Sequence, residues 1–410
     1  MAIVASLAIL ICICARALCE GWFLMNNLRL WLLALLLPFA AHAEVINLSP
    51  ADDWFAVLNG GGLKPGDEVV LAAGTYTEAK RLEMKHVGTA EKPIIIRGAK
   101  VSARPVIKRP DARQNTINMA GCQHVVLRGF DITGGDAGIR IYKDGERQSA
   151  FITIEALHIH HIDGVAITAN NEDCVYERLI FRHNEIHHTG GHGEGFYLGG
   201  NNDSKGKTTG YVFNSIVEKN YIHHLNGKNI SQGDGIEIKD GSYGNIVRGN
   251  VIHDTKYPGI TVYGTDGKEA NLIEDNVISS TGDHGIQAAA DAMIRNNTIF
   301  NTGGDGIHCR SHQSAMPGNL VIEKNAIIAC KSGSGIRINK PDKGFSGPIL
   351  VKGNQLYLGA GLRIPTGDAK LKIEENVKES GSPKGFPDGY IRNYQNEVRK
   401  FSLKDLPAMD

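Results

Sequence analysis

The sequence predicts an all-β fold in which one chain winds into a single β-solenoid of stacked coils. Two short phrases that recur along the chain predict this fold. The phrase Asn-x-apolar begins at Asn184, Asn220, Asn250, Asn276, Asn297, Asn325 and Asn354. The phrase Gly-apolar-x-apolar alternates with it and begins at Gly138, Gly164, Gly195, Gly235, Gly259, Gly285, Gly306, Gly335 and Gly361. Because a single coil cannot bury its own apolar face, such repeats with variable insertions indicate coils that stack.

The spacing of the repeats excludes other repeating folds. The shortest interval, 21 residues from Asn276 to Asn297, holds about three short strands and their turns at roughly 3.3 Å per residue. No strand–helix alternation separates the repeats, which argues against a TIM barrel or a doubly wound sheet. A propeller would need a longer and more regular period.

The N-terminus predicts export. From Met25 the sequence has a basic Arg29, an apolar run over 30–41 and a small-x-small ending at Ala43, which is typical of a secretory signal peptide cleaved after that residue. The apolar residues upstream of Met25 leave a membrane anchor as the alternative. We interpret 1–43 as a leader and expect a periplasmic or secreted protein without stable membrane association after cleavage.

The body of the chain follows in order. Residues 51–61 predict a short amphipathic helix that caps the first coil, and 63–76 and 93–98 predict the first strands. The solenoid is expected over 44–367, as one catalytic domain. From 368 to 410 the chain is polar and does not repeat, so an irregular tail packed on the solenoid is expected there.

Two polar columns are expected inside and beside the coils. The repeated asparagines, one per coil, predict a ladder of stacked amides along the axis. A histidine column accompanies them at His160, His187, His223 and His253. Stacked imidazoles either pack as a ladder or bind a metal ion.

Composition narrows the range of partners. The chain has 44 basic and 44 acidic residues, so no overall charge points to nucleic acid or to a membrane surface. Of the cysteines beyond the leader, Cys122, Cys174, Cys309 and Cys330, no pair has metal-ligand spacing. Disulfides and buried thiols both remain open.

The x positions of the glycine phrase should form two outward columns on one parallel sheet. The first column reads Arg140, Ala166, Tyr197, Glu237, Thr261, Gln287, His308, Arg337 and Arg363. The second reads Tyr142, Thr168, Gly199, Lys239, Tyr263, Ala289, Arg310 and Asn339. Basic and aromatic side chains on one face suit an acidic polysaccharide, since arginine pairs with carboxylates and tyrosine stacks on sugar rings. We expect Arg140, Tyr197, His308, Arg337 and Arg363 to bind substrate, although a merely solvated sheet face is the alternative.

Lys239 is the strongest candidate for a catalytic residue. β-Elimination of a uronate needs a base that takes the proton α to the carboxylate, a cation that stabilises the enolate and an acid that protonates the leaving oxygen. Lys239 is the predicted base, Tyr263 in the next coil the acid, and Arg310 or a bound Ca²⁺ the neutralising cation. The plain alternative is a surface ion pair between Glu237 and Lys239.

The opening L-x-PGD-x-V-x-L-x-x-GTY … KPIIIRG resembles the start of chondroitinase-B-like and alginate lyases, a group of polysaccharide lyases. The resemblance covers about 44–367 and implies a single-stranded right-handed parallel β-helix. It implies a catalytic lysine and arginine, and Ca²⁺ held by acidic and amide side chains on the same sheet. Asp234 and Glu237 are the candidate metal ligands, with Glu194 one coil away. Tyr263 stands where those lyases carry the arginine.

Other functions remain open. A uronate-polymer C5-epimerase shares the proton abstraction. A glycoside hydrolase needs two or three carboxylates in one groove, but the outward columns supply only Glu237, with Asp234 and Asp305 at strand edges. A non-catalytic carbohydrate-binding solenoid is the third class. A monomer is expected, and the sequence does not identify the uronate.

Overall fold

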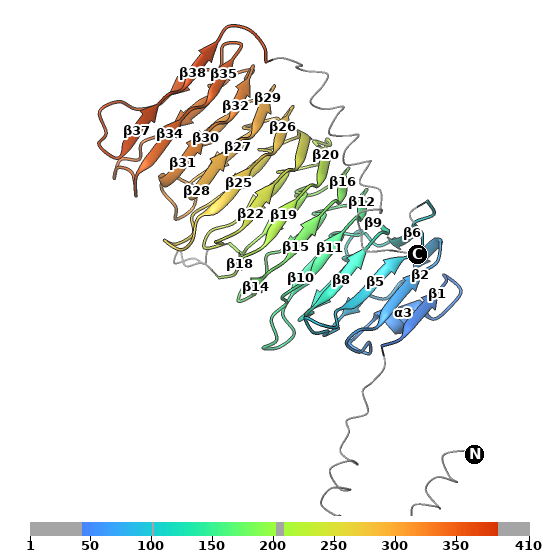
Figure 1. Cartoon of the computed structure of the whole chain (residues 1–410). Coiled ribbons are helices and arrows are strands. Elements are labelled where there is room, and N and C mark those ends of the chain that lie inside the picture. The colour runs from blue at the N-terminus through green and yellow to red at the C-terminus, as the bar shows by residue number, and fades with distance from the viewer. Residues whose placement is uncertain (1–42, 101, 202–208, 384–410) are drawn as a thin grey trace, which may run out of the picture. The chain divides into compact units, whose positions relative to one another are not determined.

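The protein, seen in a computed structural model that describes residues 43–100, 102–201 and 209–383, is a parallel β-helix (Figure 1). Most of the predicted leader and the tail from 384 onward lie outside the described residues. Each coil contributes one strand to each of three parallel sheets, so the strands of a sheet come from successive coils.

The three sheets are named A, B and C, and the strands of each are given from the first coil to the last. Sheet A contains β1 (Val45–Leu48), β2 (Glu68–Leu71), β5 (Ile94–Gly98), β8 (Val125–Arg128), β11 (Thr153–Glu155), β15 (Ile180–Arg182), β19 (Ile216–Glu218), β22 (Ile246–Arg248), β25 (Asn271–Glu274), β28 (Ala290–Arg295), β31 (Gly318–Glu323), β34 (Ile349–Lys352) and β37 (Leu371–Glu374). Sheet B contains β4 (Glu83–Met84), β7 (Ile117–Ala120), β10 (Ile139–Tyr142), β13 (Ile167–Ala169), β17 (Phe196–Leu198), β21 (Ile236–Ile238), β24 (Ile260–Val262), β27 (Ile286–Ala288), β30 (Ile307–Cys309), β33 (Ile336–Ile338) and β36 (Leu362–Arg363). Sheet C contains β3 (Gly74–Thr77), β6 (Pro105–Arg109), β9 (Asp131–Gly134), β12 (His158–His160), β16 (Glu185–His187), β20 (Tyr221–Leu225), β23 (Val251–Thr255), β26 (Val277–Ser279), β29 (Thr298–Phe300), β32 (Ala326–Ile328), β35 (Gln355–Tyr357) and β38 (Val377–Glu379).

Two smaller elements complete the fold. The helix α3 (Trp54–Leu58) begins after Asp53, whose side chain accepts a hydrogen bond from the Ala56 N–H, and it buries Trp54 and Leu58 against the first coils. It occupies the position of the predicted cap. A separate pair, β14 (Val175–Glu177) and β18 (Tyr211–Phe213), lies beside the main sheets.

The glycine phrase is explained by the close stacking of coils. Ile236 and Ile238 of β21 are buried, as predicted, and pair in register with Ile260 and Val262 of β24. A Cβ atom on Gly235 would lie 2.4 Å from the Gly259 carbonyl oxygen of the next coil. Glycine at this position therefore lets adjacent coils approach to pairing distance.

The predicted register is wrong in one coil. Ile139 pairs with Ile167, so Ala166, and not Gly164, is equivalent to the glycine that precedes the other strands of sheet B. Gly164 serves a different contact, because a Cβ there would lie 2.2 Å from the Asp136 carbonyl oxygen. Thr168 consequently belongs to the first outward column, beside Arg140, and Ala166 is buried.

The predicted asparagine ladder is confirmed. The side-chain amide of each asparagine donates to the amide oxygen of the next at 2.8–3.0 Å, in a continuous series from Asn184 to Asn376. The same side chains also bind buried backbone groups: the Asn184 backbone N–H donates to Asn220 Oδ1, and Asn220 Nδ2 donates to the Phe181 carbonyl, both at 3.0 Å.

Replacing Asn250 with alanine should lower the free energy of unfolding by roughly 2–4 kcal/mol, since buried groups lose their partners. Asn250 accepts from both the backbone and the side-chain N–H of Asn220 and donates to the Val217 carbonyl. The matched control is Asn376→Ala in the last coil, where the asparagine is only partly buried and water replaces it. Urea unfolding of both variants measures the difference, and equal losses would contradict the account.

The solenoid extends past its predicted end at residue 367. Strands β37 and β38 continue sheets A and C, and Asn376 continues the ladder. The sequence pattern fails there because Lys378 stands opposite Leu356, at a position that earlier coils fill with an apolar residue. In the last coil this position is exposed, so no apolar side chain is required.

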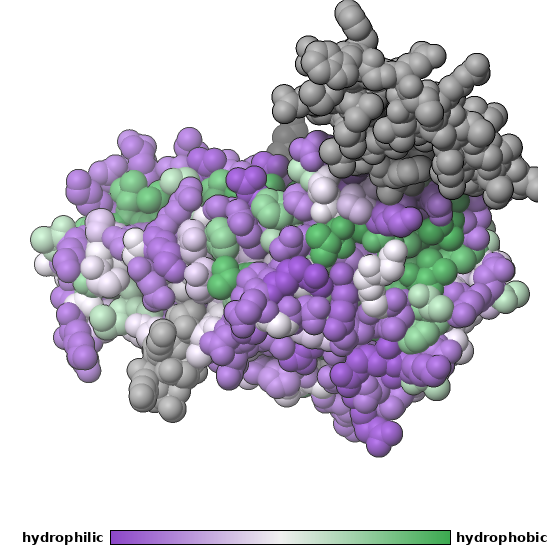
Figure 2. Space-filling view, turned by 90° about the horizontal axis from the view of Figure 1, so that it is seen from below, coloured by the Kyte–Doolittle hydropathy of each residue, from purple (hydrophilic) through white to green (hydrophobic). Residues whose placement is uncertain are grey.

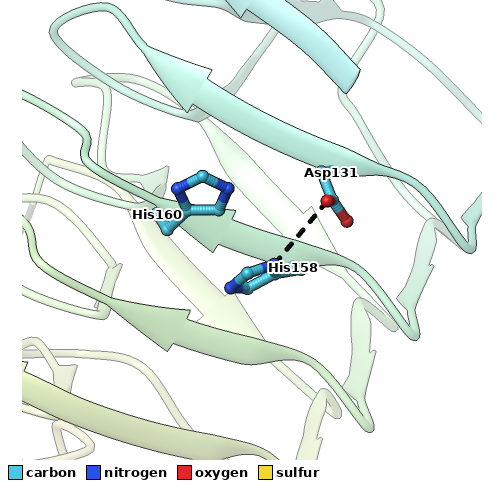
Figure 3. Close-up of side chains that lie close together, drawn as sticks. All are labelled: Asp131, His158 and His160. Atoms are coloured by element: carbon cyan, nitrogen blue, oxygen red, sulfur yellow. Dashed lines mark ion pairs between the residues drawn. The ribbon is translucent and has the colours of Figure 1, made fainter. Parts of the chain in front are cut away.

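The histidine column packs as a ladder on sheet C. His160, His187, His223 and His253 stack with ring centroids 4.8–5.4 Å apart and nearly parallel planes. His158 and His160 lie beside each other on β12 (Figure 3). His158 Nδ1 is 3.7 Å from a carboxylate oxygen of Asp131.

The histidine ladder predicts acid sensitivity. Burial, followed by repulsion from neighbouring imidazoles, lowers the pKa of His160 to about 4 and that of His187 to about 3. The unfolded chain binds protons near pH 6.5, so between that pH and about 4 it binds more protons than the folded chain. Stability should therefore be complete above about pH 6.5 and fall steadily below it.

The melting temperature as a function of pH tests this prediction, with His187→Gln as the comparison. The variant should lose less stability than the native chain between neutral pH and pH 4, and parallel curves would contradict the prediction.

The cysteines, the helices and the surface can be compared with what the composition predicts. Cys122, Cys174 and Cys309 are buried and Cys330 is partly buried, all as free thiols. Across the described ranges, no helix is long and apolar enough to cross a membrane. Figure 2 shows a face that is mostly hydrophilic, with hydrophobic residues in separate smaller patches.

Candidate functional site

A groove follows the outward face of sheet B. It consists of two adjoining pockets of about 260 and 340 Å³ that share His192, Tyr197 and Asn201. The smaller pocket includes Arg140 and Glu194. The larger pocket includes Asp234, Glu237, Lys239, Thr261, Tyr263, Gln287, Arg310 and His312. The groove therefore joins side chains from several successive coils.

Three predicted residues meet in the larger pocket. Lys239 Nζ donates to Tyr263 Oη at 3.1 Å and to Glu237 Oε1 at 3.2 Å. Tyr263 Oη in turn donates to the same carboxylate oxygen at 2.7 Å. Lys239 and Tyr263 follow their strands at equivalent positions of adjacent coils, which is why the repeat register brings them together.

The three residues are not a surface ion pair. The side chains of Lys239 and Glu237 are only 5% and 4% exposed. Lys239 Nζ also lies 5.1 Å from the ring centroid of Tyr197 and 4.5 Å from that of Tyr263, within the range of cation–π attraction. The amine is thus fixed between two aromatic rings at the base of the groove.

The phenol of Tyr263 is set up to keep its proton. Burial, followed by the charge of Glu237 and the hydrogen bond to it, raises the pKa of Tyr263 far above its usual value. A phenol with such a pKa is protonated at neutral pH, so it still carries the proton that a general acid must give.

Two buried carboxylates, Asp234 and Glu237, line the pocket of Lys239, and a third, Glu194, lines the adjoining smaller pocket. Glu194 and Asp234 occupy equivalent positions before β17 and β21, and Glu237 lies in the middle of β21. Burial, followed by repulsion from Glu237, raises the pKa of Asp234 well above its usual value, and the same two influences raise the pKa of Glu194. Thr261 Oγ1 donates to Asp234 at 2.6 Å.

Two of these carboxylates have buried oxygens without hydrogen-bond partners within the ranges that the structure describes. Among the described residues, neither carboxylate oxygen of Glu194 nor Oε2 of Glu237 has a hydrogen-bond partner, although all three atoms are buried. His192 Nδ1 lies 3.5 Å from Glu194 Oε1. Buried carboxylate oxygens without donors are the ligands that Ca²⁺ prefers.

The predicted arginines lie at separate points along sheet B. Arg310 is exposed in the same pocket as Lys239, and no hydrogen-bond or ion-pair partner of its guanidinium lies within the described part of the chain. Arg140 lies in the smaller pocket and donates twice to Asn171 Oδ1, at 2.8 and 3.0 Å. Arg337 and Arg363 pair in register in the later coils, outside both pockets.

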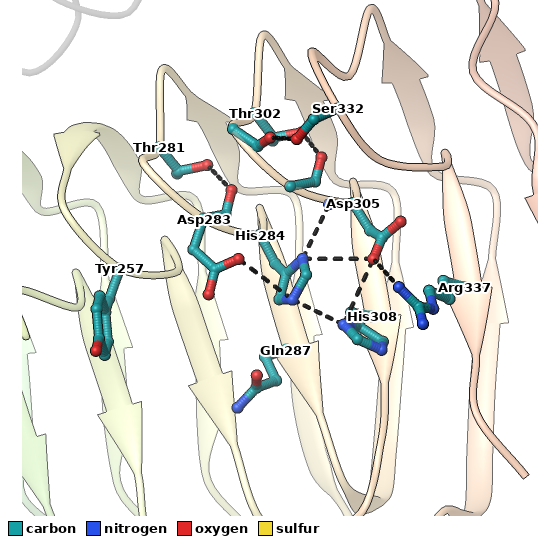
Figure 4. A network of polar contacts seen from close by, with 12 residues as sticks. Tyr257, Thr281, Asp283, His284, Gln287, Thr302, Asp305, His308, Ser332 and Arg337 are labelled. Carbon is teal, nitrogen blue, oxygen red and sulfur yellow. Dashed lines mark hydrogen bonds and ion pairs between the residues drawn. The ribbon is translucent and has the colours of Figure 1, made fainter.

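His308 belongs to another group of side chains. It is 4% exposed and contacts His284 and Asp305 (Figure 4), and also Asn339, in a network that lies two to three coils beyond Lys239. This burial leaves little of its imidazole accessible to the groove.

His312 is a residue of the larger pocket that no sequence pattern predicts. Its ring lies 4.4 Å from that of Tyr263, edge to face, and its Nδ1 lies 3.3 Å from the Gln287 amide nitrogen. Burial, together with the charges of Arg310 and Lys239, lowers the pKa of His312 to about 4. His312 lies in the loop after β30, where the repeat register does not apply, so only the folded structure brings it to Tyr263.

Comparisons with known proteins agree with this architecture. A family model described as "Right handed beta helix region" matches residues 111–377. Among curated proteins, no sequence matches the chain.

Several solved structures share the fold at low sequence identity. An alginate lyase from Paenibacillus sp. str. FPU-7 is 18% identical, with a TM-score of 0.53 over 82% of this chain and 99% of that one. The A-module of a mannuronan C-5 epimerase from Azotobacter vinelandii is 16% identical, with a TM-score of 0.54 over 77% of this chain and 87% of that one. An alginate lyase of the PL6 family is 15% identical, with a TM-score of 0.53; the match covers 83% of this chain but only 52% of that one. At these identities the similarity establishes the fold alone.

Proposed function

Because the chain belongs to the right-handed β-helix family, we propose that its groove makes it a polysaccharide lyase that cleaves a uronate-containing acidic polysaccharide, such as alginate, by β-elimination. The observation that carries the proposal is the buried contact of Lys239 with Tyr263 at 3.1 Å. An amine and a protonated phenol side by side are the base and the acid that elimination requires.

The proposed reaction assigns one step to each residue. Once it has given up its own proton, the amine of Lys239 takes the C5 proton of the uronate, and the electrons of that bond form the C4–C5 double bond. The bond from C4 to the glycosidic oxygen breaks, and the phenol of Tyr263 gives its proton to that oxygen. The guanidinium of Arg310 pairs with the uronate carboxylate, which carries the developing negative charge.

We further propose that Glu194, Asp234 and Glu237 hold Ca²⁺. When bound, the ion would supply positive charge that neutralises the uronate carboxylate and makes the C5 proton more acidic. The protein residues themselves orient the sugar, exclude water and move the two protons.

A glycoside hydrolase is the second candidate. The grouping of three buried carboxylates favours it, because a carboxyl group with a raised pKa can act as a general acid beside an ionised partner. We rank it second because it gives the buried Lys239 no role. A C5-epimerase would use the same base but reprotonate C5 from the opposite face and leave the chain intact.

An assay over alginate, pectate, glucuronan and glycosaminoglycans tests the proposal. A lyase should produce unsaturated uronates, detected by their ultraviolet absorbance, on at least one of these polymers. New reducing ends without that absorbance would indicate hydrolysis, and exchange of the C5 proton without shortening would indicate epimerisation. No change in any polymer would favour a binding role.

The predicted signal peptide suggests where the protein acts. Because acidic polysaccharides occur outside the cytoplasm, we propose that the chain acts as a periplasmic or secreted monomer.

A further inference from the structure

A second cluster of buried ionisable side chains lies on sheet B, beyond the Lys239 pocket. It contains His284 before β27, Asp305 before β30 and His308 within β30, which are 8%, 3% and 4% exposed (Figure 4). One ligand atom from each lies within 4.8 Å of the other two. The proposed elimination uses none of the three.

The hydrogen bonds of the cluster fix the protonation of His284. The backbone N–H of Asp305 donates to His284 Nδ1 at 2.9 Å. A ring nitrogen that accepts a hydrogen bond carries no proton, so the proton of a neutral His284 is on Nε2.

A second set of bonds fixes His308 in the same way. Arg337 Nε donates to Asn339 Oδ1 at 3.0 Å, which orients the Asn339 amide so that its nitrogen faces His308 Nε2, also at 3.0 Å. His308 Nε2 is therefore an acceptor, and the proton of a neutral His308 is on Nδ1.

If both histidines are neutral, the proton on His284 Nε2 faces the proton on His308 Nδ1. His284 Nε2 and His308 Nδ1 are only 2.7 Å apart, and both would be donors. Each nitrogen also faces a carboxylate oxygen: Asp283 Oδ1 lies 3.3 Å from His284 Nε2, and Asp305 Oδ2 lies 3.4 Å from His308 Nδ1. A metal ion in place of the two protons would remove this repulsion, because both nitrogens could then act as its ligands.

We propose that His284 Nε2, His308 Nδ1 and Asp305 Oδ2 bind a divalent transition-metal ion of the Zn²⁺ type. Two imidazole nitrogens and a carboxylate suit Zn²⁺ and its neighbours, whereas Ca²⁺ selects oxygen ligands. The opposite atoms of each ligand are held in place, since Asp305 Oδ1 accepts from the Ser334 N–H at 2.6 Å. Such outer hydrogen bonds are what orient metal ligands in proteins.

The ion would link adjacent coils of the solenoid. His284 belongs to the coil of β27, and Asp305 and His308 to the coil of β30. The metal would thereby stabilise the contact between these two coils. This site is separate from the proposed Ca²⁺ site and does not depend on the lyase proposal.

The test measures Zn²⁺ affinity on the whole chain without an affinity tag, after removal of metal by chelation. Competition with a chromophoric chelator gives the dissociation constant, and thermal unfolding with and without Zn²⁺ gives a second readout. His308→Gln and Asp305→Asn remove ligands from the cluster. His187→Gln is the matched control. It removes an imidazole from the histidine ladder of sheet C, a second group of clustered histidines that lies outside the proposed site.

The native chain and His187→Gln should bind one equivalent of Zn²⁺ and melt at a higher temperature with it, and Ca²⁺ at equal concentration should not replace it at this site. Either cluster variant should bind at least about 100-fold more weakly, since loss of even an outer hydrogen bond costs 10–100-fold. If His308→Gln kept native affinity, or if His187→Gln lost it instead, the proposal would be wrong. If His308→Gln did not fold, Zn²⁺ titration of the native chain with no bound equivalent and no melting shift would overturn it as well.

Discussion

Replacing Lys239 with arginine should lower turnover on the preferred uronate polymer by about 10²–10⁴-fold, the usual contribution of a general base. A guanidinium keeps its proton at every pH at which the protein is folded, so it cannot take the C5 proton. Initial rates of unsaturated-uronate formation measure the effect.

Two controls separate chemistry from folding. The melting temperature of Lys239→Arg should remain close to the native value, because the substitution keeps the charge beside Glu237. In Lys239→Ala, a small primary amine added to the buffer should restore part of the activity if the missing group is a base. Near-native turnover in Lys239→Arg would mean that Lys239 only binds substrate, and His312 would become the leading candidate for the base.

Removal of Ca²⁺ should lower turnover by about 10²-fold or more, similar to the loss of one charge-stabilising group in other enzymes. Among the described residues, Glu194 has two buried oxygens without hydrogen-bond partners, so the ion would supply both the positive charge and the missing contacts. Adding Ca²⁺ back, but not Zn²⁺, should restore the rate. Saturating Ca²⁺ at a hundred times its dissociation constant should stabilise the fold by about 2.7 kcal/mol.

Glu194→Gln tests whether these carboxylates hold the ion. The variant should fold, since glutamine removes a buried charge, but should lose the rise in melting temperature that Ca²⁺ causes. Glu374→Gln, an exposed carboxylate in the last coil, is the matched control and should respond to Ca²⁺ as the native chain does. Equal Ca²⁺ responses in both variants would remove the ion from this site.

The sequence was sufficient to predict the fold because every coil must bury apolar residues and satisfy the polar groups of its turns in the same way. Ile236 and Ile238 had to face the core, and Asn250 had to satisfy the turn between coils, so their patterns recur and can be recognised. The pattern fails where a coil does so differently, as at Ala166, which replaces a glycine. It also fails at Lys378, where no further coil covers the position.

The sequence could predict only those site residues that occupy regular positions of the repeat. Lys239 and Tyr263 follow equivalent strands, so counting along the repeat was enough to bring them together. Glu194 was recognised as a neighbour, but its burial without hydrogen-bond partners among the described residues required the fold. His312 lies in a loop of irregular length, and no periodic argument could place its ring against Tyr263.

We expect the Lys239 site to break a uronate polymer by elimination. Digestion in water enriched in heavy oxygen, followed by mass spectrometry of the oligosaccharides, tests this most directly. Elimination predicts shortened chains that end in an unsaturated uronate and carry no label from the solvent. Products that are one water heavier and contain the heavy oxygen would show hydrolysis and contradict the account.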